Sequence, residues 1–563
     1  MDHDQKTVAS QIAEMIADAG VRHIYAITGD SLNNLTDAFA KEGRVKFIHM
    51  RHEESGAFAA SAEAQLTGRL AACAGSSGPG HVHLINGLYD AQRSNAPVLA
   101  IASTCASAMF GTEYFQETDP GSLFSDCSMY VKTATTPGQV PHMLQAAMQE
   151  AVGRGGVGVI GLPADVTGQP ASESYASTEP LYTDRLPEPS EADIEEAARL
   201  INEAESVAIF AGHGAKDAAE LLDRLSDKIK APVATTYKSQ LELDGKCRNY
   251  VGHMAYLGMW SAEKAIASAD VIVLIGMNFP YPGFFPTDKK IIQTDIRAER
   301  LGRKAKVDVA CRADAGLFLS ALLPKVDEKR DSAFLDKALA DYSAIKAKFE
   351  IPLKERGTKG AVRPEFMISL LDRMADDNAV FTVDTGMNNL WTSHYLTAGN
   401  GRSMIGSFTH GSMANAMPMA IGAKTACPDR QVIAICGDGG FSMLMGELLT
   451  IIQYRLPVKI LVADNRSLAF VKWEMEMAGL PPEETDLTNP DFGKMASAMG
   501  LHAETVDDPD LLEAAMRSWL DADGPALLSV VTDRDAASFG FSEKLMDSAR
   551  PGNPLSNFSP TGA

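Results

Sequence analysis

The chain has 563 residues, too many for one hydrophobic core, and this length predicts roughly three to four domains. Its apolar fraction of 45% is that of an ordinary globular protein, and its net charge of −22 argues against nucleic acid and anionic lipid as partners, because an acidic surface repels phosphate. No apolar run reaches the ~18 residues of a transmembrane helix, the N-terminus lacks a secretory signal pattern, and the seven cysteines form no CxxC pair, so we expect a cytoplasmic protein with free thiols.

The first part of the chain alternates predicted helices and strands. Val8, Ile12 and Ile16 recur at helical spacing, and short apolar strands follow in the order HIYAIT, VKFIHM, LAACAG, VLAIAS and VGVIGL. A plausible helix follows each strand, and this alternation is typical of a parallel, doubly wound sheet. The stretch 176–192, rich in Pro, Ser, Thr and acids, predicts a linker.

Two further α/β units follow the linker. The second has the strands SVAIFAG, PVATTY, VIVLIG and KIIQTDI, and the third has AVFTVD, QVIAICGD, VKILVADN and ALLSVVT. We therefore expect an α/β protein of three consecutive doubly wound parallel-sheet domains, of which the first and third are candidates for distant copies. The expected bounds are 1–183, 184–330 and 331–535, with an irregular polar tail over 536–563.

The most specific motif follows the strand VIAI in the third unit. There Gly437-Asp438-Gly439-Gly440 precedes a predicted helix, and the next strand ends at Asn465, with 25 residues between Gly439 and Asn465. Parallel strand order brings these two strand ends side by side at the edge where α/β sheets bind ligands. A carboxylate and an amide oxygen there suit Mg²⁺, and the glycines let backbone amides approach a diphosphate. A plain glycine turn is the alternative for GDGG alone, but the spacing and the strand context favour the metal site, and the pattern resembles the thiamine-diphosphate motif.

A second signal, Arg51-His52-Glu53-Glu54, directly follows the strand VKFIHM. Alone, this tetrapeptide is more typical of a solvated helix start. Thiamine enzymes, however, need a carboxylate against the pyrimidine ring nitrogen, and a carboxylate in a mainly apolar pocket has the raised proton affinity that this task requires. Glu53 resembles that residue, and the loop 75–80 completes a pyrimidine-binding half-site. In such enzymes this half-site meets the diphosphate domain of a second subunit, which implies at least a dimer.

From about residue 5 to about residue 535 the chain resembles thiamine-diphosphate-dependent pyruvate oxidases, most of all the bacterial pyruvate dehydrogenase (quinone) branch. The resemblance implies a pyrimidine-binding first domain, an FAD-binding central domain and a diphosphate-binding third domain, with thiamine diphosphate, Mg²⁺ and FAD as cofactors. It implies a small 2-keto acid, first of all pyruvate, as substrate, and a quinone or O₂ as electron acceptor. It also implies a homo-oligomer, either a dimer or a tetramer. The stretches that carry it are TGDSLNNL, RHEESGAFAASAEAQLTG, GPGHVHLINGLYDA, YFQET, FPTDKKIIQTDI, GSFTHGSMANAMP and GDGGFSMLMGELLT.

The same resemblance assigns the cofactor contacts of the third domain. Met413 would be the apolar wedge that bends the cofactor, although a Met here is by itself more typical of core packing. Asp438 and Asn465 would hold Mg²⁺, with the carbonyl of Ser467 as a third ligand. The contacts to the diphosphate and thiazolium would come from Gly411, Ser412, Gly439, Gly440, Arg466, Leu468, Ala469, Phe470 and Val471. The family commonly has Asn at the position of Asp464 and Gly at that of Ala469, and neither departure removes the Asn465 oxygen.

The substrate-pocket positions of the oxidases match Phe115, Gln116, Phe470, Val471 and Glu474. Aromatic walls suit a small methyl ketone, although core packing is the alternative for the two Phe residues. The oxidases usually have Val where this chain has Thr385, and the added hydroxyl needs a hydrogen-bond partner, either in the substrate or in its own backbone. This departure leaves the identity of the keto acid open.

The central domain resembles the FAD-binding domain of the oxidases. Gly212-His213-Gly214 gives a glycine turn for a pyrophosphate, and Asp295 ends the strand KIIQTD, where an acid accepts from an adenosine ribose hydroxyl. The remaining contact positions are His253, Met254, Ala255, Tyr256, Gly276, Met277, Asn278, Phe279, Pro280 and Thr294. A lone GxG is weak evidence, and related decarboxylases leave this domain empty, while acetolactate synthases bind an FAD that has no redox role.

The expected reaction is the oxidative decarboxylation of pyruvate or a similar small 2-keto acid. One alternative is a non-oxidative carboligase or decarboxylase of the acetolactate synthase type. A non-catalytic cofactor-binding protein is another, and the intact set of Glu53, Asp438 and Asn465 argues against it. The quinone-reducing relatives end in an amphipathic helix that docks on lipid, whereas the tail here shows no helical stripe, so membrane association is not expected.

Overall fold

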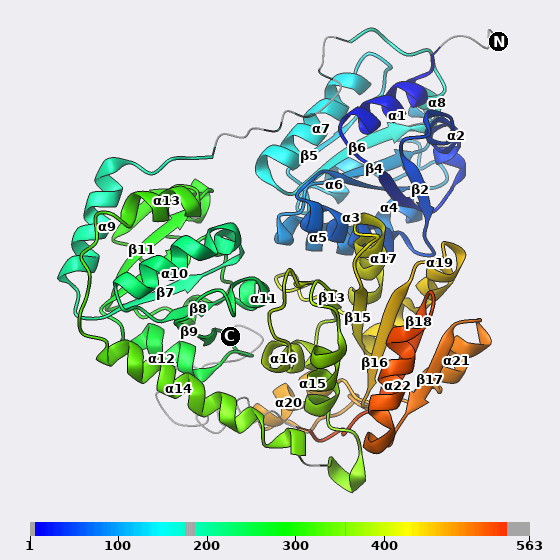
Figure 1. The fold of residues 1–563 in the computed structure, drawn as a ribbon. Helices are drawn as coiled ribbons and strands as arrows, with labels where there is room; N and C mark the ends of the chain where they lie inside the picture. The colour runs from blue at the N-terminus through cyan, green and yellow to red at the C-terminus, as the bar shows by residue number, and fades with distance from the viewer. Residues whose placement is uncertain are drawn as a thin grey trace.

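The computed structural model describes residues 6–174, 177, 180, 182, 186–354 and 356–536. These residues form three domains in chain order, each built on a six-stranded parallel sheet with helices on its faces (Figure 1). The predicted α/β class with three consecutive parallel-sheet domains is therefore confirmed. The predicted linker 176–192 lies partly outside the described residues, and the predicted tail 536–563 lies outside them except for its first residue.

The first domain has the strand order β2-β1-β3-β4-β6-β5. Its central strands are apolar on both faces, as strands covered by helices on both sides must be. Its strands are β1 (His23–Ala26), β2 (Lys46–His49), β3 (Ala71–Gly75), β4 (Val98–Thr104), β5 (Tyr130–Thr133) and β6 (Val157–Pro163). Its helices are α1 (Val8–Asp18), α2 (Asn33–Glu42), α3 (Glu53–Thr67), α4 (Pro79–His83), α5 (Ile85–Ser94), α6 (Pro120–Leu123), α7 (Val140–Arg154) and α8 (Ala164–Thr167).

The central domain has the strand order β12-β11-β10-β7-β8-β9. Numbered within the domain and read from β9, this is the order 3-2-1-4-5-6 of dinucleotide-binding sheets. Its strands are β7 (Val207–Ala211), β8 (Val233–Thr235), β9 (Tyr250–His253), β10 (Val271–Ile275), β11 (Lys290–Asp295) and β12 (Val309–Arg312). Its helices are α9 (Glu191–Glu203), the 3₁₀ turn η3 (His213–Ala218), α10 (Ala219–Lys228), the 3₁₀ turn η4 (Tyr237–Ser239), α11 (Gln240–Leu243), α12 (Trp260–Ser268) and α13 (Ala315–Leu322), and α14 (Ala333–Phe349) leads to the third domain.

The third domain repeats the strand order of the first, as β14-β13-β15-β16-β18-β17. A shared order is what two distant copies would show. Its strands are β13 (Val380–Val383), β14 (Ser403–Gly406), β15 (Val432–Gly437), β16 (Val458–Asp464), β17 (His502–Val506) and β18 (Ala526–Val531). Its helices are α15 (Pro364–Met374), α16 (Met387–Tyr395), α17 (Ala416–Ala426), α18 (Asp438–Leu444), α19 (Leu448–Gln453), α20 (Ala469–Met477), α21 (Phe492–Ala498) and α22 (Pro509–Asp521).

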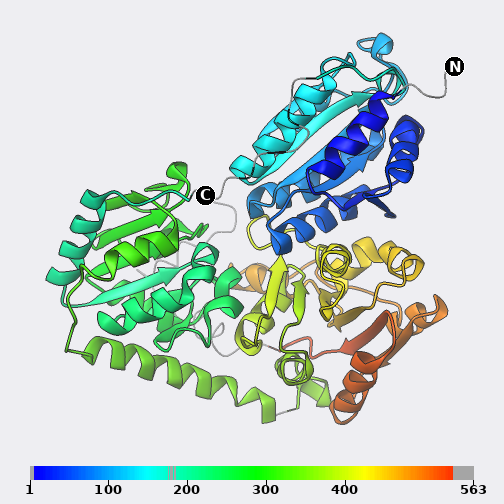
Figure 2. The ribbon, with the colours of Figure 1, turned by 45° about the horizontal axis from the view of Figure 1, so that its top comes forward.

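The first and third domains pack together through α3 and α17 (Figure 2). Small residues let the two helices approach closely: a side chain on Gly422 of α17 would place its Cβ 2.0 Å from the carbonyl oxygen of Ala59 on α3. The central domain lies beside this pair, as both views show. Within the described ranges, every helix is either too short or too polar to span a bilayer.

The sequence analysis missed five strands: β5, β9, β12, β14 and β17. Each of them lies at an edge of its sheet. β5, β12 and β17 are exposed or half-buried at two or more positions, so their sequences lack the continuous apolar run by which the central strands were recognised. β9 (YVGH) and β14 (SMIG) are mostly buried, but glycine and polar residues interrupt such a run in both.

Candidate functional site

One polar cluster lies at the carboxyl edge of the third sheet. Asp438 is the first residue of α18, directly after β15, and Asn465 follows β16. The two strands are paired in parallel, with Gly437 opposite Ala463, so both side chains emerge at the same edge. The structure therefore brings together the two residues that the sequence motif singled out.

The Asp438 carboxylate is buried and held by three donors. Its Oδ1 accepts from the backbone N–H of Gly439 at 2.9 Å, and its Oδ2 accepts from the N–H of Arg466 and from Nδ2 of Asn489, both at 2.7 Å. Burial raises the pKa of Asp438 to about 6; the hydrogen bond from Asn489 opposes this rise, and the negative charge of buried Asp464 adds to it. Two buried carboxylates at one point suit a divalent cation.

Further oxygens lie at the same edge. Oδ1 of Asn465 accepts from the N–H of Ser467 at 3.0 Å and keeps a second lone pair. Oγ of Ser467 is buried and has no hydrogen-bond partner among the described residues. An unpartnered oxygen beside a carboxylate and an amide oxygen is a donor set that fits Mg²⁺ and a diphosphate. Sequence reasoning missed Asn489, whose only sequence signal is its place in a Thr-Asn-Pro loop before α21.

The glycines after Asp438 permit close packing around this edge. A Cβ on Gly439 would lie 2.8 Å from Cδ2 of Leu468 and 3.3 Å from Cε of Met413, so these two apolar side chains meet over the glycine. A Cβ on Gly440 would lie 1.9 Å from Oδ2 of Asp384. Any larger residue at either position would displace the groups that surround the cluster.

Buried Asp384 organises the loop that carries Gly411, Ser412 and Met413. Its Oδ1 accepts from the backbone N–H and from Nδ2 of Asn415, each at 3.1 Å. Burial raises the pKa of Asp384 to about 7, against the lowering effect of the surrounding backbone N–H groups. The sequence analysis did not choose Asp384 as a site residue, although it directly precedes Thr385.

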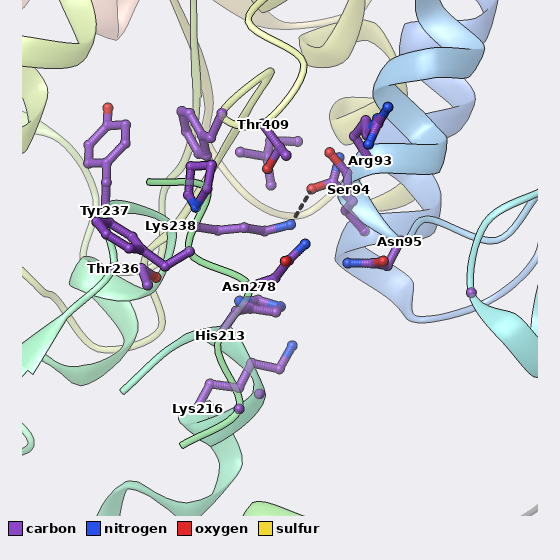
Figure 3. Close-up of a pocket in the computed structure, with 18 of the residues that line it drawn as sticks. Arg93, Ser94, Asn95, His213, Lys216, Thr236, Tyr237, Lys238, Asn278 and Thr409 are labelled. Carbon is purple, nitrogen blue, oxygen red and sulfur yellow. Dashed lines mark hydrogen bonds between the residues drawn. The ribbon is translucent and has the colours of Figure 1, made fainter. Parts of the chain in front are cut away.

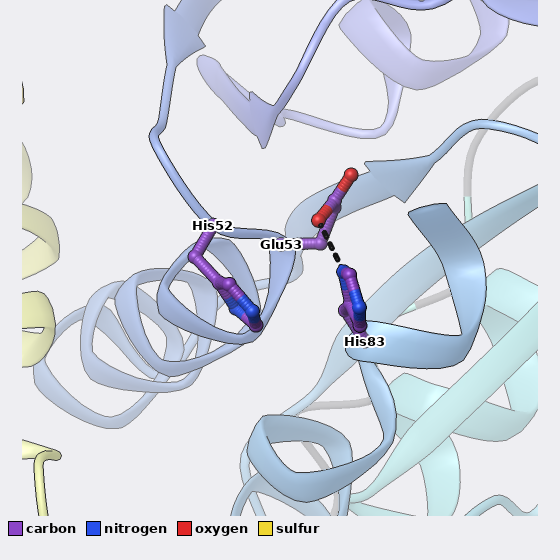
Figure 4. Close-up of side chains that lie close together, drawn as sticks. All are labelled: His52, Glu53 and His83. Carbon is purple, nitrogen blue, oxygen red and sulfur yellow. Dashed lines mark hydrogen bonds and ion pairs between the residues drawn. The ribbon is translucent and has the colours of Figure 1, made fainter. Parts of the chain in front are cut away.

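Glu53 lies in the first domain, as the first residue of α3. His52 caps this helix, with Nδ1 accepting from the N–H of Glu54 at 3.2 Å. Glu53 is buried, its Oε2 lies 3.0 Å from Nδ1 of His83, and the His83 ring stacks on that of His52 at 4.6 Å (Figure 4). Glu54 has a different partner, because its Oε1 accepts from Nδ2 of Asn86 at 2.7 Å. The two neighbouring carboxylates thus have different surroundings.

Glu53 and Asp438 belong to separate clusters within one chain. In the described part of the chain they have no hydrogen-bond partner in common, since Glu53 contacts His83, whereas Asp438 contacts Gly439, Arg466 and Asn489. That a second subunit completes each half-site stays a prediction.

A cavity of about 1340 Å³ opens where the three domains meet (Figure 3). The predicted positions that line it are Gly214, His253, Met254, Ala255, Tyr256, Gly276, Asn278, Phe279, Pro280 and Asp295 from the central domain, and Thr385, Gly411, Phe470 and Glu474 from the third. The predicted central positions outside the lining are Gly212, Met277 and Thr294. Gly212 instead lets two loops touch, because its Cβ would lie 2.5 Å from Cα of Met277.

Two residues of the cavity lining carry buried polar atoms. Asp295 ends β11, is buried, and accepts from the N–H of Arg297 at 2.9 Å; burial raises its pKa. Oγ1 of Thr385 is buried and has no hydrogen-bond partner among residues 6–536 as described. Val would fill the same volume without this requirement, so the hydroxyl at Thr385 points to a ligand that completes its hydrogen bonding.

The residues of the predicted substrate pocket lie in two separate places in this chain. Thr385, Phe470 and Glu474 line the cavity, and burial raises the pKa of Glu474. Phe115 lies on a loop of the first domain and is 74% exposed. Its neighbour Gln116 adopts a φ of +60° and accepts from Oγ of Ser77 at 3.0 Å. Phe115 and Gln116 therefore lie on a different surface from Thr385, Phe470 and Glu474.

Comparisons of the whole chain and of its separate domains with known proteins indicate the same family. Models of the thiamine pyrophosphate enzyme match the chain in three parts: the N-terminal TPP binding domain over residues 6–123, the central domain over 194–322 and the C-terminal TPP binding domain over 384–530. A putative thiamine pyrophosphate-containing protein of Bacillus subtilis (strain 168), YdaP, is 32% identical over 93% of this chain and 92% of its own length.

Two further relatives differ in the activity their names give. The pyruvate oxidase of Lactiplantibacillus plantarum is 33% identical over 88% of this chain and 84% of its own length. A probable acetolactate synthase large subunit of Methanocaldococcus jannaschii is 31% identical over 93% of this chain and 92% of its own length.

Proposed function

Because this chain belongs to the thiamine pyrophosphate enzyme family, whose relatives act on small 2-keto acids, we propose that it oxidatively decarboxylates pyruvate or a similar small 2-keto acid. The proposed cofactors are thiamine diphosphate, Mg²⁺ and FAD, and the proposed final electron acceptor is a quinone or O₂. The proposal follows the pyruvate oxidase relative rather than the acetolactate synthases.

The cavity is the observation that carries this proposal. One wall is the carboxyl edge of a sheet with the strand order of dinucleotide-binding domains, and it includes Asp295, Gly276 and Gly214. Another wall belongs to the third domain and includes Thr385 and Phe470. A dinucleotide bound along the central sheet would therefore reach residues of the thiamine domain, which is the geometry that electron transfer between the two cofactors requires.

The chain's own residues have defined tasks in this scheme. Thiamine diphosphate supplies the nucleophilic carbon for decarboxylation, and FAD accepts the two electrons that the decarboxylated substrate gives up. Glu53, buried and oriented by His83, would hold a proton against the pyrimidine ring nitrogen. Asp438, Asn465 and the carbonyl of Ser467 would hold Mg²⁺ and, through it, the diphosphate.

Other residues would bind the substrate and exclude water. The hydroxyl of Thr385, which has no partner among the described residues, would bond the keto acid, and Phe470 would cover the reacting carbon on its apolar side. Phe115 and Gln116 would come from a second copy of the chain, together with Glu53, because all three belong to the first domain and lie outside the cavity lining. The active assembly would accordingly be a dimer or a tetramer, in which the first domain of one copy completes the site of another copy.

A second candidate function is a non-oxidative carboligase of the acetolactate synthase type, with an FAD that stays oxidised. The acetolactate synthase relatives, which match at similar identity, favour it. The two functions share the residues that handle thiamine diphosphate and differ in whether the flavin takes up electrons.

An anaerobic absorption spectrum tests the proposal. The purified protein receives thiamine diphosphate and Mg²⁺, and its flavin band near ~450 nm is recorded before and after pyruvate is added. Bleaching of the band is expected. A band that persists while pyruvate disappears would favour the carboligase. A band that persists with pyruvate intact would require other 2-keto acids to be tried, and Thr385 would be the first residue to examine.

A further inference from the structure

Lys238 extends its side chain into the cavity. It belongs to η4, directly after β8, and its Nζ donates to Oε1 of Gln65 on α3 of the first domain at 2.9 Å. Figure 3 shows the side chain stretched across the cavity, with Thr409 on one side and Asn278 and His213 on the other. No part of the cofactor motifs identified in the sequence includes this lysine.

The ammonium group is incompletely satisfied by protein. It has three N–H donors, and in the described part of the chain it makes one hydrogen bond, to the neutral amide of Gln65. Burial lowers the pKa of Lys238, and the nearby charges of Asp90 and Glu242 oppose this effect. An enclosed cation with one neutral acceptor is unfavourable unless an anion comes to it.

Neither of the neighbouring acids makes a hydrogen bond to Lys238 in the described part of the chain. Oδ2 of buried Asp90 accepts from Oγ of Ser61 at 2.9 Å, its Oδ1 has no hydrogen-bond partner among the described residues, and burial raises the pKa of Asp90 to about 6. Glu242 pairs with Nδ1 of His213 at 2.7 Å. Two more cations, Lys216 and Arg300, lie near enough to disfavour the charge on Lys238. This part of the cavity therefore has an excess of positive charge and would attract an anionic group.

The strand order indicates which part of a dinucleotide lies here. Along the sheet edge the order β11, β10, β7, β8, β9 brings Asp295, Gly276, Gly214, Lys238 and His253 into succession. The glycine turn is the place for the diphosphate. Lys238 lies one strand beyond it, in the direction away from Asp295, and at this end the central domain contacts the third domain, where the hydroxyl groups of Tyr237 and Thr392 lie 2.7 Å apart. In the proposed function the flavin ring must reach the thiamine domain, so the ring end of FAD belongs beside Lys238.

We propose that Lys238 stabilises the negative charge that the isoalloxazine ring of FAD acquires on reduction. The inference rests on the proposed function, in which FAD binds in this cavity. On two-electron reduction the ring gains two electrons from the decarboxylated substrate and one proton, so one negative charge remains on it. An adjacent ammonium stabilises this anion more than the neutral oxidised ring and so favours reduction.

The test compares flavin reduction potentials in the FAD-loaded protein. K238M removes the charge and keeps an unbranched chain, K238R keeps the charge, and K337M removes a charge from an exposed position of α14 outside the cavity lining. Each protein is titrated against a redox dye of known potential, and FAD affinity is measured separately by fluorescence on the apoprotein. K238Q replaces K238M in the same comparison if the methionine variant does not fold.

K238M is expected to lower the equilibrium constant for flavin reduction by about tenfold or more, which is ~30 mV for a two-electron couple. K238R and K337M are expected to stay close to the parent protein. An unchanged potential in K238M would overturn the inference, and an unchanged potential with weaker FAD binding would assign the lysine to the diphosphate instead. A parent protein that binds FAD, but whose flavin no 2-keto acid reduces, would contradict the proposed function. The effect of Lys238 on the flavin potential could still be measured with the redox dye. A parent protein that binds no FAD would overturn both the proposed function and the inference.

Discussion

Asp438 and Asp464 share one hydrogen-bond donor, since Nδ2 of Asn489 lies 2.7 Å from Oδ2 of the first and 2.8 Å from Oδ1 of the second. Both carboxylates are buried, and like charges in a buried site repel each other. A single amide N–H₂ group offsets this repulsion only in part. A divalent cation at the same edge would relieve it, so the additional acid would make the proposed Mg²⁺ site depend more strongly on its metal.

Asp464→Asn is therefore expected to weaken metal retention. Removing one of two buried negative charges would raise the Mg²⁺ concentration for half-saturation by about tenfold, within the range typical of residues that support a metal ligand. The measurement is the binding of Mn²⁺ by electron paramagnetic resonance, with thiamine diphosphate present. Asp486→Asn, on the surface beyond Ser467, is the matched control for a lost charge. Equal Mn²⁺ affinity in both variants would contradict the prediction.

Glu53→Gln is expected to lower turnover by roughly 10²–10⁴-fold, the contribution that proton transfer typically makes. The amide keeps the shape of the side chain and cannot take up the proton. Thiamine diphosphate affinity should change little, because the diphosphate is proposed to bind at the third domain instead. Hydrogen–deuterium exchange at the thiazolium carbon, followed by NMR after acid quench, reports this step alone. Glu54→Gln is the control, since Glu54 contacts Asn86 instead, and an equal loss of exchange in that variant would disprove a special role for Glu53.

Thr385→Val is expected to raise the stability of the apoprotein and to weaken substrate binding. The hydroxyl has no hydrogen-bond partner among the described residues, so its removal should stabilise the apoprotein by about 1 kcal/mol. If the hydroxyl bonds the keto acid, KM for the substrate should rise about tenfold, because a hydrogen bond to a charged group is lost. Thermal denaturation and steady-state kinetics give the two values. A variant with unchanged KM would show that the hydroxyl does not contact the substrate.

Asp90→Asn is expected to change the pH dependence of stability. Burial raises the pKa of Asp90 to about 6 in the folded protein, above its usual value of 3.8, so the folded state binds a proton that the unfolded state has lost between these pH values. The stability of the parent protein therefore falls as pH rises from about 4 to about 6 and stays level above that. The variant lacks this loss.

The gain in the free energy of unfolding for Asp90→Asn should accordingly be near zero at pH 4 and reach roughly 2–3 kcal/mol at pH 7. Denaturant unfolding of the apoprotein at several pH values measures it. Asp126→Asn, at an exposed acid, should show no such trend. A gain that is the same at pH 4 and pH 7 would show that Asp90 does not titrate in this range.

The sequence predicted the elements that a local residue pattern identifies and the residues that strand order brings together. Central strands such as β15 and β16 are buried on both faces and form apolar runs, whereas the edge strand β17, with the sequence HAETV, is largely exposed and was missed. Asp438 and Asn465 could be paired because each follows one of two successive strands. Asn489 and Lys238 could not, because their importance depends on groups that come together only when loops and whole domains have been placed.

The close contact of Gly422 with Ala59 also has a consequence for how the cavity is filled. Because α3 and α17 are in such close contact, the first and third domains should move little relative to each other. FAD bound in the cavity would contact this pair of domains on one side and the central domain on the other, and would tie them together. The loaded protein should accordingly resist proteolysis between its domains better than the empty one.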